Sequence, residues 1–247
     1  MSSIMIEPCL KELKLSSFVK NYKSYAKEAA SKDHSHEGYL HALAEEELSY
    51  RTENRIKKLI SNAKFPKLKQ LSEFNFSHIP ELDKQKIIEL ADCYWVGDSY
   101  NCCFMGQTGL GKSHLATSLG YEACKRKITT RFYTAAQLVN ELSEAKDSHA
   151  LIKLQNRLLR YQLIIVDELG YIPLSKRDAE LLFQFFSERY EQGSLIVTTN
   201  LEFQDWTRFM NDPTMTSALL DRFTHHCHIF NLIGESYRFN QRKDKDA

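Results

Sequence analysis

Residues 106–113, Gly-Gln-Thr-Gly-Leu-Gly-Lys-Ser, constrain the fold of this chain more than any other stretch. They match the phosphate-loop pattern G-x-x-x-x-G-K-[ST], and they lie between an apolar run and a segment of helical character, as such a loop requires. The glycines allow backbone N–H groups to turn towards phosphate oxygens, and the N-terminus of the following helix adds positive charge. A chance glycine-rich turn does not explain the full match in this setting. The sequence therefore predicts a nucleoside triphosphate site.

The chemistry of this site follows from the side chains of the loop. Lys112 is expected to reach the β- and γ-phosphates, and Ser113 is expected to ligate Mg²⁺. The residues expected to contact the nucleotide here are Gly106, Gln107, Thr108, Gly109, Leu110, Gly111, Lys112, Ser113 and His114.

Apolar β-favouring segments alternate with helical patterns from residue 102 onwards. This alternation predicts an α/β fold with a central parallel sheet flanked by helices, in which loops at the carboxyl ends of the strands form the site. The expected strands are 102–105, 130–133, 163–166, 194–198 and 228–232. The expected helices are 112–126, 135–160, 178–192 with Gly193 as its C-cap, 204–210 and 213–222.

Two of these strands deliver polar side chains to the expected site. Strand 163–166 runs directly into Asp167 and Glu168. We expect Asp167 to hold Mg²⁺ through water and Glu168 to polarise the water that attacks the γ-phosphate. Strand 194–198 leads to Asn200, whose amide could orient water and γ-phosphate, although asparagine is also common in turns after strands.

Arg222, at the end of the last expected helix, allows two interpretations. A cation at a helix C-terminus is favoured by the helix dipole. The same residue could act as an arginine finger on the nucleotide of a neighbouring subunit. Spacing alone does not separate these alternatives.

Residues 1–69 are expected to form a small helical domain, and residues 70–247 the nucleotide-binding core. Apolar residues recur at helical spacing through residues 1–65, and Glu47/Arg51 and Glu53/Lys57 are placed to form ion pairs at i, i+4. A further short helix is expected over 83–94. The end of the first domain carries seven basic residues against one acidic one, namely Arg51, Arg55, Lys57, Lys58, Lys64, Lys67 and Lys69. This stretch is either a solvated helix face or a contact for the phosphates of double-stranded DNA.

Composition adds three expectations. The net charge of +1 gives no overall sign of a nucleic-acid partner, so only the local basic stretch suggests one. The six cysteines include no C-x-x-C pair and are expected to be reduced thiols of a cytoplasmic protein, and no apolar run is long enough to cross a membrane. Residues 225–228, His-His-Cys-His, are not expected to bind one metal ion together, because neighbouring residues of an extended segment point to opposite faces.

Several motifs together resemble one family. The phosphate loop, Asp-Glu-Leu-Gly-Tyr at 167–171, Thr-Thr-Asn at 198–200, Leu-Asp-Arg-Phe at 220–223 and Gly-Glu-Ser-Tyr-Arg at 234–238 resemble AAA+ ATPases of the IstB type. These are ATP-binding helper proteins of insertion-sequence transposons, and they are similar to the helicase loader DnaC. The resemblance includes residues 63–66 and 74–76 and extends over nearly the whole chain.

The resemblance implies a P-loop NTPase of AAA+ type that uses ATP and Mg²⁺. It implies Lys112 and Ser113 as Walker A, Asp167 and Glu168 as Walker B, Asn200 as sensor 1, Arg222 as the finger and Arg238 as a sensor 2-like arginine. Two departures are visible. Gln107 stands where proline is usual, and the sequence ends nine residues after Arg238, so no full C-terminal lid is expected.

The resemblance also implies a function. An ATPase of this type would oligomerise on DNA in the presence of ATP and assist a transposase encoded beside it. A helicase loader of the DnaC kind is the alternative. A small-molecule kinase has no need of Glu168, Asn200 and an intersubunit Arg222 together, and an intact Glu168 argues against a DNA-binding module without enzymatic activity.

Overall fold

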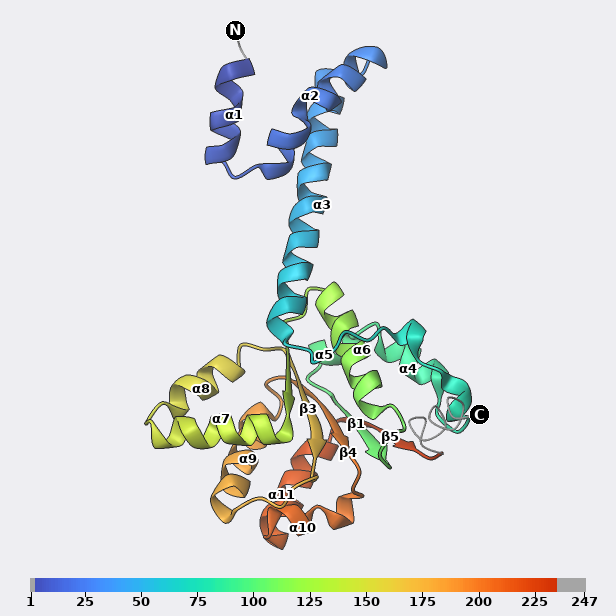
Figure 1. Cartoon of the computed structure of the whole chain (residues 1–247), viewed down its shortest axis with the longest axis vertical. Helices are drawn as coiled ribbons and strands as arrows, with labels where there is room; N and C mark the ends of the chain where they lie inside the picture. Colours follow the sequence, from blue (N-terminus) through green and yellow to red (C-terminus); the bar gives the residue numbers. More distant parts are fainter. Residues whose placement is uncertain (1–2, 235–247) are drawn as a thin grey trace, which may run out of the picture. The chain divides into compact units, whose positions relative to one another are not determined.

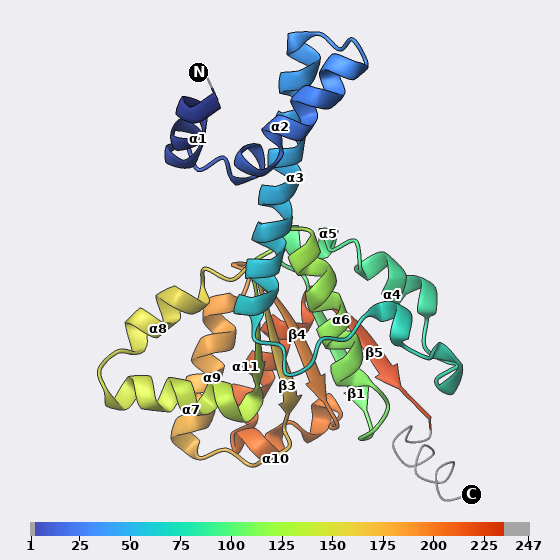
Figure 2. The same cartoon turned by 45° about the horizontal axis from the view of Figure 1, so that its top comes forward.

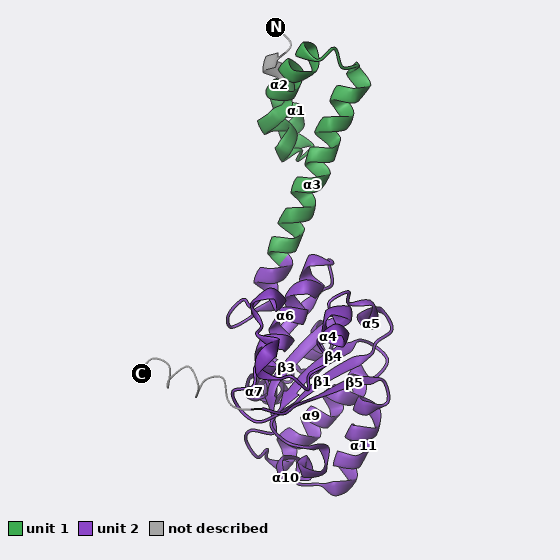
Figure 3. Cartoon of the chain, turned by 90° about the vertical axis from the view of Figure 1, so that its right-hand side faces the viewer, with its two compact units in different colours: residues 1–58 green, residues 59–247 purple. Residues whose placement is uncertain are grey.

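The computed structural model describes residues 3–234, with side chains from residue 6 onwards. The chain divides into two compact units, Met1–Lys58 and Leu59–Ala247 (Figure 3). This division falls inside a long helix, ahead of the boundary at residue 69 expected from the sequence. Each unit has apolar clusters of its own.

The first unit is helical, as the spacing of its apolar residues predicted. It contains α1 (Ser3–Glu12), α2 (Ser16–Ser31) and most of α3 (His36–Ala63). Its core is small and consists of Leu10, Tyr22 and Leu43 with partly buried neighbours. None of the helices in the described part of the chain combines the length and apolar character needed to cross a membrane.

Glu47 of α3 connects this helix to α2 through its carboxylate, and the Glu47 side chain is only 5% exposed. It accepts the backbone N–H of Ser17 at 2.8 Å and the Nε–H of Arg51 at 2.7 Å. Ser17 lies in the first turn of α2, where the helix dipole favours a negative group. The Glu47–Arg51 pair is thus confirmed, and so is the pair of Lys57 with Glu53, at 3.7 Å.

The second unit is built on a five-stranded sheet in the order β2-β3-β4-β1-β5, and all its neighbouring strands are parallel (Figures 1 and 2). The five expected strands are confirmed, each slightly longer than predicted. Their bounds are β1 Asn101–Gly106, β2 Thr130–Thr134, β3 Leu163–Leu169, β4 Ser194–Thr199 and β5 Cys227–Leu232.

Helices cover both faces of this sheet, because alternate strand residues point to opposite sides. Leu163 and Ile165 of β3 share a core with α6, whereas Ile164 and Val166 share one with α7, α9 and α11. The helices are α4 Lys84–Leu90, α5 Tyr94–Gly97, α6 Lys112–Lys125, α7 Ala135–Asp147, α8 Leu151–Leu158, α9 Lys176–Arg189, α10 Thr207–Met210 and α11 Pro213–Thr224. Single 3₁₀ turns form at Leu71–Glu73, Phe76–His78 and Phe203–Asp205.

Four predicted helices differ from the observed ones. The expected helix 135–160 is two helices, α7 and α8, and the expected helix 204–210 is a 3₁₀ turn followed by the short α10. The expected helix 83–94 already ends at Leu90 as α4, and α5 begins only at Tyr94. The fourth difference concerns Gly193, because α9 already ends at Arg189 with Tyr190 as its C-cap. Gly193 is required for space instead, since a Cβ there would lie 2.5 Å from a guanidinium nitrogen of Arg189.

That guanidinium is buried and holds the edge of the sheet at which the strands begin. Arg189 is 2% exposed, and burial lowers the pKa of its guanidinium to about 10, so it remains charged at neutral pH. Its nitrogens donate hydrogen bonds of 2.6–3.2 Å to the backbone carbonyls of Leu158, Tyr161, Gln162 and Ser194. The charge is therefore solvated by peptide dipoles from two segments, residues 158–162 and the start of β4, rather than by a carboxylate.

Candidate nucleotide-binding site

The predicted phosphate loop connects β1 to α6. Gly109 and Gly111 adopt left-handed backbone angles, with φ of +93° and +85°, which glycine adopts without strain. Helix α6 begins at Lys112 directly after Gly111. The Nζ of Lys112 donates to the carbonyls of Gly106 and Gln107, each at 2.7 Å, and therefore lies over the loop. Backbone N–H groups, a helix N-terminus and an ammonium group thus converge, as a phosphate site requires.

The two carboxylates predicted after β3 are held by one hydroxyl group of β4. The hydroxyl of Thr198 donates to a carboxylate oxygen of Asp167 at 2.5 Å and accepts the backbone N–H of Glu168 at 2.9 Å. Asp167 is buried, whereas Glu168 is exposed and has a left-handed φ of +61°. The β3–β4 register shifts between Val166 and Leu169, which turns Glu168 out of the regular strand.

A cavity of about 560 Å³ lies beside the loop at the carboxyl ends of the strands. It brings together most of the predicted site residues, namely Thr108, Gly109, Leu110, Gly111, Lys112, Ser113, His114, Glu168 and Asn200. Asp167 lies behind its wall, through its bond to Thr198, which lines the cavity itself. Gly106 and Gln107 instead line a second hollow of about 520 Å³.

The opposite wall of the first cavity comes from a segment that the sequence motifs did not assign to the site. It consists of Pro66, Lys67, Lys69, Glu73, Phe74, Asn75, His78 and Ile79. The ring of Phe74 packs over the loop, because a Cβ on Gly111 would lie 2.6 Å from it, and it meets the ring of His114 edge-on at 5.3 Å. The backbone carbonyl of Gln70 lies 3.0 Å from the Nε2 of His114. The loop and the start of α6 are therefore packed against a segment that precedes them by about thirty residues in the sequence.

The sequence contained features of this wall, but they did not assign its residues to the nucleotide site. The aromatic pair Phe74 and Phe76 belongs to the family resemblance, yet irregular segments give no periodicity that would place it against the loop. Lys67 and Lys69 were grouped with the residues expected to contact DNA. Here both line the first cavity, where their charges face the same space as Lys112.

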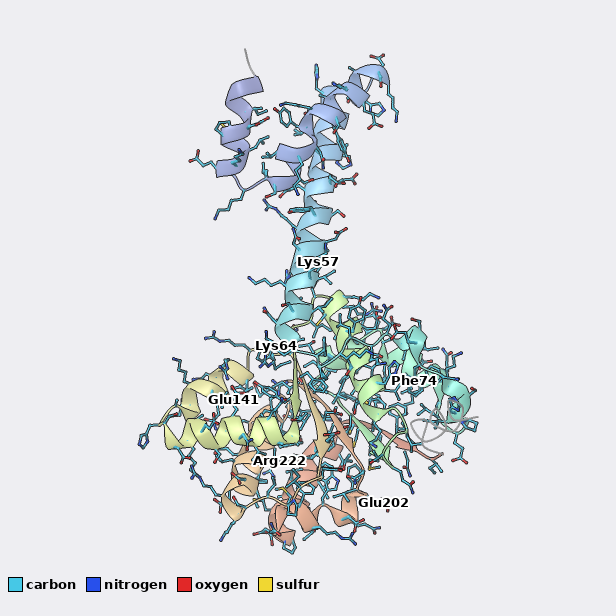
Figure 4. All side chains as sticks on the ribbon, viewed as in Figure 1. Lys57, Lys64, Phe74, Glu141, Glu202 and Arg222 are labelled. Atoms are coloured by element: carbon cyan, nitrogen blue, oxygen red, sulfur yellow. The ribbon has the colours of Figure 1, made fainter. Side chains whose placement is uncertain are left out.

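The second hollow lies on the other side of the loop. Gln107, Leu110, Asn200, Glu202 and Asp205 contribute to it. Figure 4 labels one residue from the lining of each space, Phe74 for the first and Glu202 for the second. Leu110 and Asn200 line both spaces and therefore lie at the boundary between them.

Of the two predicted arginines, Arg222 does not lie at this site. The guanidinium of Arg222 donates to the carbonyl of Ala218 at 2.8 Å and lies 5.5 Å from the centre of the Phe183 ring (Figure 4). It lines neither of the two cavities described above. Arg238 lies outside the described residues.

The cysteines of β1 contribute packing rather than reactivity. Cys102 and Cys103 are fully buried, and burial raises the pKa of both thiols well above its usual range. Burial also raises the pKa of Cys93 to about 12. All six cysteines are free thiols in the described part of the chain.

Comparison with known proteins places this fold and site in a family. The sequence profile of the IstB-like ATP binding proteins matches residues 8–245. The chain belongs to this family. It is 35% identical over 231 residues to an insertion sequence IS5376 putative ATP-binding protein of Geobacillus stearothermophilus, with 94% of this chain and 92% of the relative covered. It is 31% identical over 238 residues to the corresponding IS21 protein of Pseudomonas aeruginosa, with 96% and 90% covered.

Solved structures of low sequence identity share the fold. A DNA replication initiation factor superposes with a TM-score of 0.57 at 21% identity, covering 74% of this chain and 54% of that one. DnaI superposes with a TM-score of 0.56 at 14% identity, covering 72% and 94%. The chain thus spans about half the length of the replication factor. The predicted AAA+ P-loop architecture of this IstB-like protein is confirmed.

Gly111 offers a direct test of the packing between Phe74 and the loop. We expect Gly111→Ala to weaken ATP binding at least tenfold, because the residue has a positive φ and its new methyl group would meet the Phe74 ring. Gly97→Ala is the matched control, since nothing lies within 4 Å of a Cβ at that position. Titration calorimetry with ATP measures both. Equal affinities for the two variants would contradict the described loop geometry.

Proposed function

We propose that this IstB-like protein is a Mg²⁺-dependent ATPase that assembles on double-stranded DNA and assists a transposase encoded beside it in selecting target DNA. The observation that carries the enzymatic part is the position of Glu168. Its carboxylate belongs to the same cavity as Lys112 and Ser113, while Thr198 holds its backbone. The names of the relatives associate them with insertion sequences, which favours transposition over the helicase-loader alternative.

Within the first cavity we place the phosphates of ATP on the loop and Lys112. The base then lies towards Phe74 and Asn75, which form the wall facing the loop. Lys67 and Lys69 add positive charge near the phosphates. We assign ATP to the first cavity because Lys112, Ser113 and Glu168 line it. None of these three residues lines the second hollow.

The residues beside the loop fit a magnesium ion. Ser113 offers a hydroxyl oxygen and Asp167 a carboxylate, and oxygen ligands of this kind are those that Mg²⁺ prefers. Thr198 holds the Asp167 carboxylate through a hydrogen bond, which fixes its orientation. When bound, the ion would offset charge on the β- and γ-phosphate oxygens.

Hydrolysis then needs a water molecule activated beside the γ-phosphate. Glu168 accepts a proton from this water while the water oxygen attacks the γ-phosphorus. The bond from that phosphorus to the β–γ bridging oxygen breaks, and ADP and phosphate leave. Lys112 stabilises charge on the phosphates, and the amide of Asn200 orients the water and the γ-phosphate.

We predict that binding and hydrolysis separate in two variants. Lys112→Ala should lose ATP binding, because Lys112 anchors the phosphates before any chemical step. Glu168→Gln should keep the affinity of the parent and lose turnover by a factor on the order of 10² or more, because only the water activation is removed. Binding by calorimetry and turnover by phosphate release test both. Normal hydrolysis by Glu168→Gln would remove Glu168 from this role.

We predict that Thr198 is a positioning residue for Glu168. Thr198→Val removes both hydrogen bonds at nearly constant volume, and we expect kcat to fall at least tenfold while ATP affinity changes less than about threefold. Thr198→Ser should recover most of the activity, because it restores the hydroxyl. Thr130→Val is the control, since Thr130 is equally buried but lies at the start of β2. Unchanged kcat in Thr198→Val would contradict the positioning role.

For DNA we propose the basic C-terminal part of α3 as the contact. Arg55, Lys57 and Lys58 are exposed there, whereas Arg51 is engaged with Glu47 and with the carbonyl of Lys14. Lys64 is retained in this proposal, while Lys67 and Lys69 are assigned to the nucleotide instead.

We also propose that Arg222 acts on the nucleotide of a second copy, so that ATP promotes a head-to-tail assembly. Its position outside both cavities of its own chain supports this role.

The basic C-terminal part of α3 should determine how DNA affinity depends on salt. Replacing Arg55, Lys57 and Lys58 together by alanine should lower the slope of log affinity against log salt by roughly 0.9 for each phosphate that the variant no longer neutralises, at any DNA sequence. Replacing Lys20, Lys23 and Lys27 of α2 removes the same charge from another exposed helix and should have little effect. Fluorescence anisotropy over a series of salt concentrations measures both slopes. Equal slopes in the two triple variants would make the α3 stretch a solvated face.

A further inference from the structure

Glu191, His225 and His226 form a cluster at the sheet edge opposite the nucleotide cavity. Glu191 lies in the turn between α9 and β4, and the histidines lie between α11 and β5. The cavity lies at the carboxyl ends of the parallel strands, whereas these turns precede the strands. One donor atom from each of the three side chains lies within 4.8 Å of the others. The cluster is therefore separate from the site assigned to ATP.

The two histidines of this cluster do not lie on an extended segment, contrary to the expectation from the sequence. His225 caps α11 with helical angles of −53° and −44°, and β5 begins only at Cys227. The two imidazole rings consequently lie side by side, with centroids 4.1 Å apart, rather than on opposite faces. Within 225–228, only Cys227 and His228 have the strand geometry that would separate their side chains.

Tyrosines from two other segments hold the rings in place. The hydroxyl of Tyr190 lies 3.1 Å from the Nδ1 of His225, and the ring of Tyr100 stacks on His226 at 4.8 Å with an interplanar angle of 18°. When the Nδ1–H of His225 donates to the tyrosine oxygen, its Nε2 carries the lone pair that a metal ion needs. Hydrogen bonds of this kind orient the histidine ligands of many metal sites.

We propose that Glu191, His225 and His226 bind a zinc ion. Two imidazoles and one carboxylate are ligands that suit Zn²⁺ rather than Mg²⁺ or Ca²⁺, and three protein ligands leave a fourth position for water. Zinc bonds of about 2.0–2.2 Å place tetrahedral ligands roughly 3.3 Å apart, so the cluster closes slightly on binding. None of the three side chains is buried, which allows this adjustment. The C-terminal end of α11 adds favourable partial charge for a cation.

Zinc in this position would add a second link between two segments that the Tyr190–His225 hydrogen bond already joins. It would connect the turn after α9 to the end of α11, three residues beyond Arg222. The bound ion would therefore reduce the motion of the helix end that carries the proposed finger. Zinc binding itself depends only on the cluster, so it is measurable whether or not Arg222 has that role.

The test uses the full chain without a histidine tag, in a Cys9→Ser background because Cys9 is exposed. The protein is stripped with EDTA, desalted and titrated with Zn²⁺ in competition with a chromophoric chelator. We expect one equivalent of zinc per chain. His225→Asn and His226→Asn should each lower the affinity by more than tenfold, and Glu191→Gln by about tenfold.

His149→Asn is the matched control, since His149 is an exposed histidine outside the cluster, and it should bind zinc like the parent. ATP affinity, measured on every variant, reports whether the fold is kept. Less than one equivalent of zinc in the parent would overturn the proposal. So would a triple variant, Glu191→Gln with His225→Asn and His226→Asn, that binds zinc as tightly as the parent.

Discussion

The hydroxyl group of Thr198 makes the two hydrogen bonds on which the arrangement of the site depends. One holds the buried carboxylate of Asp167, and the other holds the backbone N–H of Glu168. A non-glycine residue with positive φ costs roughly 1–3 kcal/mol, so Glu168 keeps this conformation only because neighbouring groups fix it. The turn directs Asp167 inwards and Glu168 towards the cavity. The carboxylate of Asp167 is therefore buried, whereas that of its neighbour Glu168 is exposed.

This arrangement requires a sheet that does not shift. At the edge where the strands begin, the buried side chain of Asn101 accepts the N–H of Leu195 at 2.9 Å and donates to the carbonyl of Phe223 at 3.0 Å, which ties β1 to β4 and α11. The guanidinium of Arg189 binds four carbonyls at the same edge. Buried polar groups are costly unless they are paired, so the hydrogen bonds of Asn101 and of the two terminal nitrogens of Arg189 favour one arrangement of these segments. The loops at the carboxyl ends of the strands can therefore form the site on a fixed sheet.

Local sequence patterns predicted most of the fold and the centre of the site. The phosphate loop, the five strands and the residues after β3 and β4 all follow from short motifs and apolar runs. Features set by contacts between distant segments could not be predicted. The packing of Phe74 over Gly111, the space that Arg189 takes at Gly193 and the helical backbone of His225 each depend on tertiary structure.

The location of the nucleotide base distinguishes the two cavities beside the loop. Irradiation of the protein with 8-azido-ATP, followed by peptide mapping, measures this location directly. We predict a label within residues 66–79, the wall that contains Phe74, and its loss in Lys112→Ala and with excess ATP. A label in residues 201–205 or 231–234 would place the base in the second hollow and contradict the assignment of the first cavity to ATP.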